Sequence, residues 1–597
     1  MAQRCVVAVF YTLQTAGQPF RWPRAWWRCR RCFRPRGDLA DPRRREGVRR
    51  EPLSSGLWPP PSSSCPGRGF RPPLSPAAGR VSAPRTCGPD GVWRLLGPHV
   101  WRGRYYTYRI RAYHPTTGNI ETMETPDPYS HACSADAGRS LICHLPPWEL
   151  GPEEVPQLDH RADAVIYELH VRDFSARDPT VEPALRGKYL AFEQEGTSGD
   201  LHLRRLADAG LTHVHLLPTY DFGSVPERVA DRSEPRVNEH AAPDSEEQQA
   251  AVMSVADRDS FNWGYDPVLY GVPEGSYATN PDGLARVEEH RRMVAALHRK
   301  GLRVVADVVF NHVLASGPES SRSVLDKCVP GYYLRRSEDG RVEHSTCMNN
   351  TATERYMMER LVVDMVRRWA VEHRVDGFRF DLMGHVALQC MKRCRATLDS
   401  LTLAEHGIDG ERLLLYGEGW EFGEVAGGAR GPTGCQRFLA GTGIASFNDH
   451  LRDAILGGSP FEDPRLQGFA TGQGLRPFPE DQGLDQGSPQ EQMKKLKVAA
   501  DTIRVCLASG LRAFVLEEDC FGRRHVPASE VHGGRAAYVV SPAEVVNFIC
   551  VHDNETLYDS TVWKLSPWIA TPCERIRSNW LCTAFLALGH GVPLFHA

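Results

Sequence analysis

After residue 163 the sequence predicts an α/β fold, a (β/α)8 TIM barrel, from two observations. Eight short apolar runs with strand character alternate with mostly helical connections, as such a barrel requires. Four of these runs are followed by segments rich in carboxylates. The carboxyl ends of all strands open on the same face of a barrel, so these polar segments are expected to meet there.

The individual strands are predicted from β-branched and aromatic runs, and the helices from apolar spacing and closing glycines. Helices are expected at Gly199–Ala209, around Leu284–Arg299 and over about Thr353–His373, and a glycine closes the first two. The eight expected strands, in chain order, are Val165–Val171, His213–Pro218, Arg303–Phe310, Gly377–Phe380, Leu413–Gly417, Ile444–Phe447, Val545–Val551 and Val592–Phe595.

Three domains are expected along the chain. Residues 1–90 are rich in arginine and proline and poor in acids, so they are expected to be disordered, a transit peptide or a mispredicted start. Residues 91–150 contain the alternating segment Arg104–Tyr113 and the turn His114–Gly118, which predict part of a β-sandwich. Residues 151–597 are expected to form the barrel.

Composition argues against two classes of partner. A formal net charge of −3 over 597 residues gives no general electrostatic reason to bind nucleic acid or an anionic membrane. No apolar run approaches the ~20 residues that span a bilayer. The 17 cysteines are scattered, and although Cys29 and Cys32 have zinc-like spacing, no second pair follows at a suitable distance. No nucleic acid, no membrane and no metal are therefore expected.

Four segments carry the candidate chemistry, and each follows a short β-branched or aromatic run. They are Asp307–His312, Asp376–Asp381, Leu413–Trp420 and Val551–Glu555. Such a run predicts a buried strand, so these carboxylates stand where strands end. One such segment would carry little weight, whereas four in order predict an active site.

Together with Phe261–Pro267, Gly271–Tyr277 and Asn448–Asp453, these segments resemble the α-amylase superfamily of glycoside hydrolases. Within it they are similar to the pullulanase-type debranching enzymes, the plant and algal limit dextrinases. The resemblance covers about residues 91–597, and residues 91–141 look like the second half of a starch-binding sandwich. The family's last barrel helix and C-terminal β-sandwich have no counterpart here, so an incomplete gene product, truncated at the eighth strand, is expected.

The resemblance assigns roles to three carboxyl groups. Retaining cleavage of a glycosidic bond takes a nucleophile and an acid/base, with their carboxyls ~5–5.5 Å apart. By motif match, Asp381 is the nucleophile, Glu418 is the acid/base and Asp553 is the third carboxylate, which holds sugar hydroxyls. An acid must carry its proton near neutrality, so Glu418 needs a raised pKa, which Asp381 and the apolar side chain of Trp420 are expected to supply.

Other side chains near these motifs are expected to bind the sugar. Arg379 is expected to keep Asp381 ionised by charge pairing, Asp307 to organise the site, and His312 and His552 to be neutral donors to hydroxyls. The full set of substrate-binding candidates is Trp263, Tyr265, Asp266, Asp307, His312, Arg379, His385, Trp420, His552 and Asn554.

Some of these assignments leave alternatives open. Trp263 and Tyr265 are expected to stack on a sugar face, although Trp263 also fits plain core packing. For His385 a structural role and a subsite role are equally open. Asn311 occupies a position that binds calcium in some relatives, but a structural role is expected here, so calcium is possible without being indicated.

The function implied is hydrolysis of α-1,6 branch links in pullulan, limit dextrins and amylopectin-type glucans during starch metabolism, without a cofactor. Two alternatives stay open: an α-1,4-acting hydrolase of the amylase type, which the spacing of the carboxylates equally allows, and a non-catalytic glucan-binding scaffold. A plastid location is expected, with the cytoplasm as the alternative. The oligomeric state is left open.

Overall fold

A computed structural model describes residues 98–148, 155–242, 244–478, 483–566 and 569–596. The segment 1–90, expected to be disordered or a leader, lies outside these residues, as do Cys29 and Cys32. Among the described helices none is both long enough and apolar enough to cross a bilayer.

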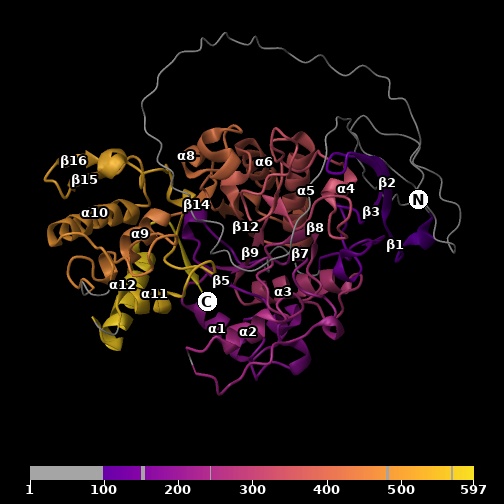
Figure 1. Cartoon of the computed structure of the whole chain (residues 1–597), viewed down its shortest axis with the longest axis horizontal. Coiled ribbons are helices and arrows are strands. Elements are labelled where there is room, and N and C mark those ends of the chain that lie inside the picture. The colour runs from indigo at the N-terminus through magenta and orange to yellow at the C-terminus, as the bar shows by residue number, and fades with distance from the viewer. Residues whose placement is uncertain (1–97, 149–154, 243, 479–482, 567–568, 597) are drawn as a thin grey trace, which may run out of the picture.

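Eight parallel strands close into a barrel at the centre of the molecule (Figure 1). Their order around the ring is β12-β13-β14-β17-β18-β5-β6-β9, and closure comes where β18 pairs with β5, with Leu594 opposite Ile166. Every one of the predicted strands is confirmed. The strands are β5 (Ile166–Leu169), β6 (His213–Leu216), β9 (Arg303–Val308), β12 (Gly377–Phe380), β13 (Leu414–Gly417), β14 (Ala445–Phe447), β17 (Val545–Asn547) and β18 (Val592–His596).

The interior of the barrel has an apolar layer and a polar layer. Ile166, Val305 and Leu414 belong to one buried hydrophobic cluster that also takes in residues of β14, β17 and β18. Residues two positions apart on a strand point to the same side. The interior therefore continues from Ile166 to Glu168 and from Val305 to Asp307, both of which are buried. This alternation places the polar layer at the carboxyl ends of the strands.

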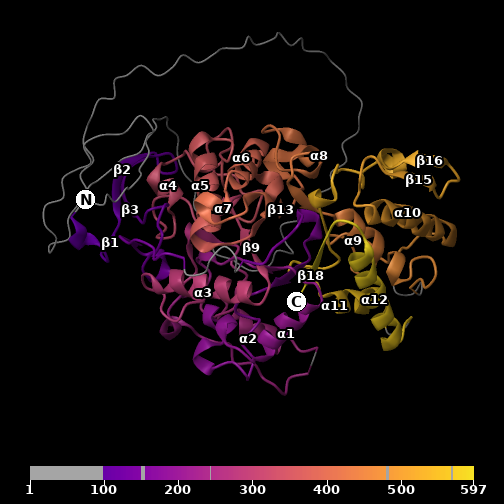
Figure 2. The same ribbon diagram turned by 180° about the vertical axis from the view of Figure 1, so that it is seen from behind.

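Helices surround the strands in both views (Figures 1 and 2). The predicted helices are found, and α5 shows why one forms, because its buried residues Leu361, Met365 and Trp369 recur every four positions and make one apolar face. The helices are α1 (Ser198–Asp208), α2 (Glu247–Met253), α3 (Ala285–Arg299), α4 (Leu325–Cys328), α5 (Tyr356–His373), α6 (Leu388–Asp399), α7 (Leu403–His406), α8 (Gln436–Leu439), α9 (Asp449–Leu456), α10 (Pro489–Leu507), α11 (Leu557–Lys564) and α12 (Pro572–Leu588).

Short antiparallel two-stranded sheets are present in addition to the barrel. The predicted strand and turn before residue 120 form the hairpin β2–β3, and Arg368 of α5 fixes the chain that follows by donating to the carbonyls of Tyr129 and Ser130. Whether this region belongs to a sandwich stays a prediction. The additional strands are β1 (Tyr105–Tyr106), β2 (Tyr108–His114), β3 (Asn119–Thr125), β4 (Ser140–Leu141), β7 (Tyr220–Phe222), β8 (Pro267–Pro273), β10 (His312–Val313), β11 (Asn349–Asn350), β15 (Val515–Glu518) and β16 (Arg524–Pro527).

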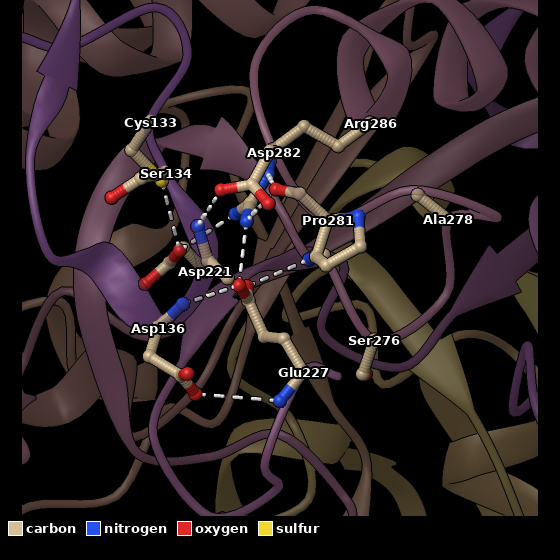
Figure 3. A network of polar contacts seen from close by, with 12 residues as sticks. Cys133, Ser134, Asp136, Asp221, Glu227, Ser276, Ala278, Pro281, Asp282 and Arg286 are labelled. Atoms are coloured by element: carbon tan, nitrogen blue, oxygen red, sulfur yellow. Dashed lines mark hydrogen bonds and ion pairs between the residues drawn. The ribbon is translucent and has the colours of Figure 1, made fainter. Parts of the chain in front are cut away.

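A buried ion network joins helix α3 to the loop after β7 (Figure 3). The guanidinium of Arg286 donates to Asp221 at 2.8 Å and to Glu227 at 2.6 Å, and all three side chains are inaccessible to solvent. Burial and the neighbouring Glu227 raise the pKa of Asp221 to about 7, and they also raise the pKa of Glu274 well above its usual range. The cation of Arg286 thus contacts Asp221 and Glu227. Asp221 and Glu274, whose pKa values are raised, keep part of their protons near neutrality.

Replacing Arg286 with methionine should destabilise the fold by about 3–5 kcal/mol, because it leaves buried carboxyls without their cation. The loss should be smaller at pH 5.5 than at pH 8, since acid neutralises carboxyls whose pKa is raised. Urea unfolding at both pH values measures it. On the same helix, Arg292→Met removes a half-exposed ion pair to Glu193, and it should change stability by less than ~0.5 kcal/mol. Equal effects of the two substitutions would contradict the role given to Arg286.

Candidate active site

The polar layer at the carboxyl ends of the strands is organised around one guanidinium. Arg379, on β12, places Nη1 3.0 Å from Asp307 Oδ1 and 3.0 Å from Asp381 Oδ1. Its Nη2 lies 3.0 Å from Glu418 Oε1. Parallel pairing puts Arg379 of β12 opposite Asp307 of β9, so the register of the barrel itself creates the first of these contacts. Three of the four predicted motifs therefore meet on one cation.

Backbone and amide donors fix the two central carboxyls. Asn311 Nδ2 donates to Asp381 Oδ2 at 2.8 Å, and the backbone N–H of Leu382 donates to Glu418 Oε2 at 2.7 Å. Leu382 has φ 41°, a left-handed conformation that costs a non-glycine residue about 1–3 kcal/mol. Strain of this kind persists only where the surroundings impose it, and here it directs an N–H at Glu418.

The two carboxyls titrate in different ranges. Burial, together with the charges of Asp381 and Asp553, raises the pKa of Glu418 to about 8 despite Arg379. Burial and Asp307 raise the pKa of Asp381 to about 6. At pH 7 Asp381 is therefore mostly ionised and Glu418 mostly protonated. The expected contact between Arg379 and Asp381 is present, but burial outweighs it, so the pairing does not by itself set the pKa of Asp381.

The prediction that His552 is a neutral donor is wrong. Burial alone would lower the pKa of His552, but Asp553 and Glu168 raise it well above its usual range. Its Nδ1 lies 2.8 Å from Glu168 Oε1, and its Nε2 lies 3.3 Å from Asp553 Oδ1. The imidazole is thus a cation between two carboxylates, and it positions Asp553 at the exposed rim of the site.

His312 is also placed differently from the expectation of a free donor. It is buried, with Nδ1 2.6 Å from Asn311 Oδ1 and Nε2 2.8 Å from the carbonyl oxygen of Tyr265. Both ring nitrogens therefore face protein acceptors, and His312 supports Asn311 and the Tyr265 backbone. Burial lowers the pKa of His312 to about 4.

Two aromatic candidates border the cluster. The Tyr265 hydroxyl donates to Asp307 Oδ2 at 2.6 Å, and its ring stacks on His552 with centroids 5.0 Å apart. Trp263 packs edge-on against the same imidazole, and 36% of it is exposed. The exposure disfavours plain core packing for Trp263. A sugar-stacking role for either ring stays a prediction.

None of the remaining candidates hydrogen-bonds to a side-chain carboxyl of Asp381, Glu418 or Asp553 among the described contacts. Asp266 is buried and interacts with Ser224 and the Gly223 backbone. Trp420 packs against the apolar layer of the barrel. Asn554 donates to the carbonyl of its neighbour Asp553.

His385 keeps both of its predicted roles open. It is buried against Phe422, with ring centroids 4.4 Å apart. Both ring nitrogens are buried without a hydrogen-bond partner among the described residues. A structural histidine normally has such a partner, since an unpaired buried polar atom is costly.

Sequence reasoning missed two buried residues that complete the polar layer. Glu168 of β5 accepts the backbone N–H of His552 at 2.9 Å, in addition to its contact with the ring. His215 of β6 bridges Glu168 and Asp307, at 3.7 and 3.2 Å. The available signal was a lone acid within the apolar strand of β5, whose position faces the barrel interior. An isolated charge in a buried strand is rarely tolerated unless it is paired.

Comparisons with known proteins agree with this geometry. No family model matches the sequence. The chain is 44% identical over 559 residues to the chloroplastic pullulanase 1 of Arabidopsis thaliana, a match that spans 92% of this chain and 57% of the relative. It is 34% identical over 556 residues to the pullulanase of Klebsiella aerogenes, over 84% of this chain and 48% of the relative. The chain belongs to the pullulanase family.

Solved structures of this pullulanase family share the fold. The Klebsiella pneumoniae pullulanase complexed with maltotriose matches with a TM-score of 0.77 at 33% identity, over 85% of this chain and 51% of that one. A pullulanase from Paenibacillus barengoltzii, in complex with maltohexaose and α-cyclodextrin, matches with a TM-score of 0.64 at 30% identity, over 85% of this chain and 66% of that one. The chain spans about half the length of the curated pullulanases described above.

Substituting Glu168 with glutamine should lower the pKa of His552 by about one unit or more, because the amide keeps the shape but removes a charge 2.8 Å from the ring. Because its pKa is raised, the charged form of His552 stabilises the fold. This contribution is complete at low pH and is lost as the pH rises through that pKa. In Glu168→Gln this loss should begin at a lower pH. NMR of the histidine ring nitrogens during a pH titration measures it, and Glu411→Gln, at an exposed position, should leave the signal of His552 unchanged.

Proposed function

We propose that the chain is a retaining glycoside hydrolase that cleaves α-1,6 branch links in pullulan, limit dextrins and amylopectin-type glucans. The observation that carries the proposal is a single guanidinium holding two carboxyls whose pKa values differ, about 6 for Asp381 and about 8 for Glu418. Two neighbouring carboxyls with one proton between them are what retaining cleavage needs.

In the proposed reaction Asp381 attacks the anomeric carbon while Glu418 gives its proton to the departing glycosidic oxygen. The sugar becomes covalently attached to Asp381, and Glu418 then takes a proton from the water that releases it. Arg379 stays bound to both groups and balances the charge that moves between them. Asp553, at the rim, holds sugar hydroxyls and is itself held by His552.

The sugar-binding surface is proposed to include Trp263 and Tyr265 as stacking rings, with His385 offering unpartnered nitrogens to a hydroxyl. The partner is therefore a branched α-glucan. Relatives crystallised with maltotriose and maltohexaose support a glucan ligand for this chain as well.

The two alternatives are less well supported. An α-1,4-acting hydrolase would use the same carboxyls, but the relatives at 44% and 34% identity are pullulanases. A non-catalytic scaffold has no need for a buried acid whose pKa is raised to about 8. No cofactor belongs to the proposal, because two carboxyls and a water molecule complete the reaction. A plastid location is proposed from the chloroplastic relative.

The purified chain should release maltotriose from pullulan, because cutting only the α-1,6 links of that polymer leaves three-glucose units. Glu418→Gln should lower kcat by ~10²–10⁴-fold, since the amide cannot supply the proton. Chromatography of the products measures both results, with Glu411→Gln as the matched exposed control. Trisaccharides that still contain an α-1,6 link would show amylase-type cleavage. A folded chain that binds glucan without cutting it would favour the scaffold.

The rate should depend on pH as a bell with limbs near 6 and near 8. Activity should rise with pH as Asp381 loses its proton and becomes a nucleophile, and should fall again as Glu418 loses the proton it must donate. These limbs belong to the pair, since the two groups interact. A profile of kcat/KM against pH on pullulan checks the shape. Full activity at pH 9.5 would contradict the role of Glu418 as the acid.

A further inference from the structure

A second cluster of reactive side chains lies away from the polar layer, on the hairpin β15–β16 and helix α10. It joins Asp501 of α10, Cys520 just after β15, and His532 in the 3-10 helix Ala528–Gly533. His532 Nε2 lies 3.2 Å from Asp501 Oδ2 and 4.0 Å from Cys520 Sγ. One carboxylate oxygen, one sulfur and one imidazole nitrogen all lie within 4.8 Å of one another. In Figures 1 and 2 the hairpin lies beside α10 at the edge of the molecule.

The arrangement differs from that of a nucleophilic cysteine. In a Cys-His-Asp relay the thiol and the carboxylate use opposite nitrogens of the imidazole, so that one end takes the proton while the other is held. Here Cys520 and Asp501 both face Nε2 of His532. A nucleophile also needs a lowered pKa, whereas burial and the nearby Asp501 raise the pKa of the Cys520 thiol to about 11. The three groups converge on one point instead of forming a chain.

Convergence on a point is the geometry of a metal-ligand set. With the usual bond lengths of zinc, tetrahedral ligands stand roughly 3.4 Å apart for nitrogen and oxygen and roughly 3.6 Å apart for nitrogen and sulfur. The observed separations of 3.2 and 4.0 Å differ from these by a few tenths of an ångström. A small rotation of the Cys520 side chain would bring its sulfur into place.

The other contacts of these three side chains leave ligand atoms available to a metal ion. Asp501 is almost completely buried and is oriented by two donors: Arg504 Nη1 to Oδ1 at 3.0 Å, and the backbone N–H of Cys520 to Oδ2 at 2.8 Å. Oδ2 therefore keeps a lone pair for the point it shares with His532. Cys520 and His532 are partly exposed, so an ion can enter and a water molecule can complete four ligands.

We propose that Asp501, Cys520 and His532 bind a zinc-class divalent ion that fastens the β15–β16 hairpin to helix α10. Sulfur with imidazole selects zinc or a similar transition metal over calcium or magnesium, which prefer oxygen alone. Binding replaces the thiol proton of Cys520, so affinity rises with pH. No metal is expected from the sequence, and the proposed site departs from that expectation.

The buried acids around Arg286 do not compete for this role. Asp221, Glu227 and Glu274 also bring carboxylate oxygens within 4.8 Å of one another. The guanidinium of Arg286, however, already donates to Asp221 and Glu227 and occupies the position of a cation there (Figure 3). At Asp501 the guanidinium of Arg504 contacts only Oδ1, and among the described contacts it reaches neither Cys520 nor His532.

The test is metal binding by the full chain in zinc buffers of known free concentration, with the metal content of the dialysed protein measured. The unchanged chain should hold about one zinc ion. Cys520→Ser and His532→Gln should each bind zinc at least ~10-fold more weakly. Cys573→Ser removes an exposed free thiol and serves as the matched control, which should bind as the unchanged chain does. Circular dichroism establishes that each variant is folded, and two separate ligand variants guard against the failure of one.

Cobalt(II) supplies an independent readout, because thiolate coordination gives it a strong charge-transfer absorption. That absorption should appear with the unchanged chain and with Cys573→Ser, and should be lost in Cys520→Ser. Zinc should also raise the thermal unfolding temperature only where the three ligands are intact. Equal zinc binding by the unchanged chain and both ligand variants, or bound cobalt without the thiolate absorption, would overturn the proposal.

Discussion

The contact on which the candidate site depends is the sharing of one guanidinium by three carboxyl groups. Arg379 lies 3.0 Å from an oxygen of each of Asp307, Asp381 and Glu418. Without a cation, three acids at the end of a buried strand layer would all be driven to the neutral state. With one cation beside them, some of these carboxyls are ionised and the rest keep their protons. Asp307, whose pKa is lowered, and then Asp381 ionise before Glu418, and the negative charge of Asp381 helps Glu418 to retain its proton.

The barrel and the carboxyl motifs were predictable because both depend on local pattern. A run such as Arg303–Val308 is rich in β-branched residues and is followed by Asn311 and His312, so it identifies a buried strand and the direction in which it opens. Two-residue alternation then puts Asp307 and Arg379 inside the barrel. Around Arg379 the structure gathers Asp381 and Glu418, which were predicted to react, and Asp307, which was predicted to organise the site.

What the sequence did not reveal depends on distant partners. The charge of His552 depends on its neighbour Asp553 and also on Glu168, which is 384 residues away along the chain, and no local pattern predicts the second pairing. The same holds for His312, whose ring is occupied by Asn311 and by the backbone of Tyr265. The Asp501, Cys520 and His532 cluster comes from three separate segments, so its spacing matches no zinc motif. A pKa or a ligand set is a property of the folded neighbourhood.

Closure of the barrel has a consequence for the time at which the site appears during synthesis. Strand β5 has β6 on one side and β18 on the other, and β18 is formed by Val592–His596. More than four hundred further residues must therefore be synthesised before the strand that carries Glu168 gains its second neighbour. Pairings across such separations close slowly. A chain still on the ribosome would hold Arg379 and its acids in a sheet that has not yet closed, so the polar layer should be completed late in synthesis.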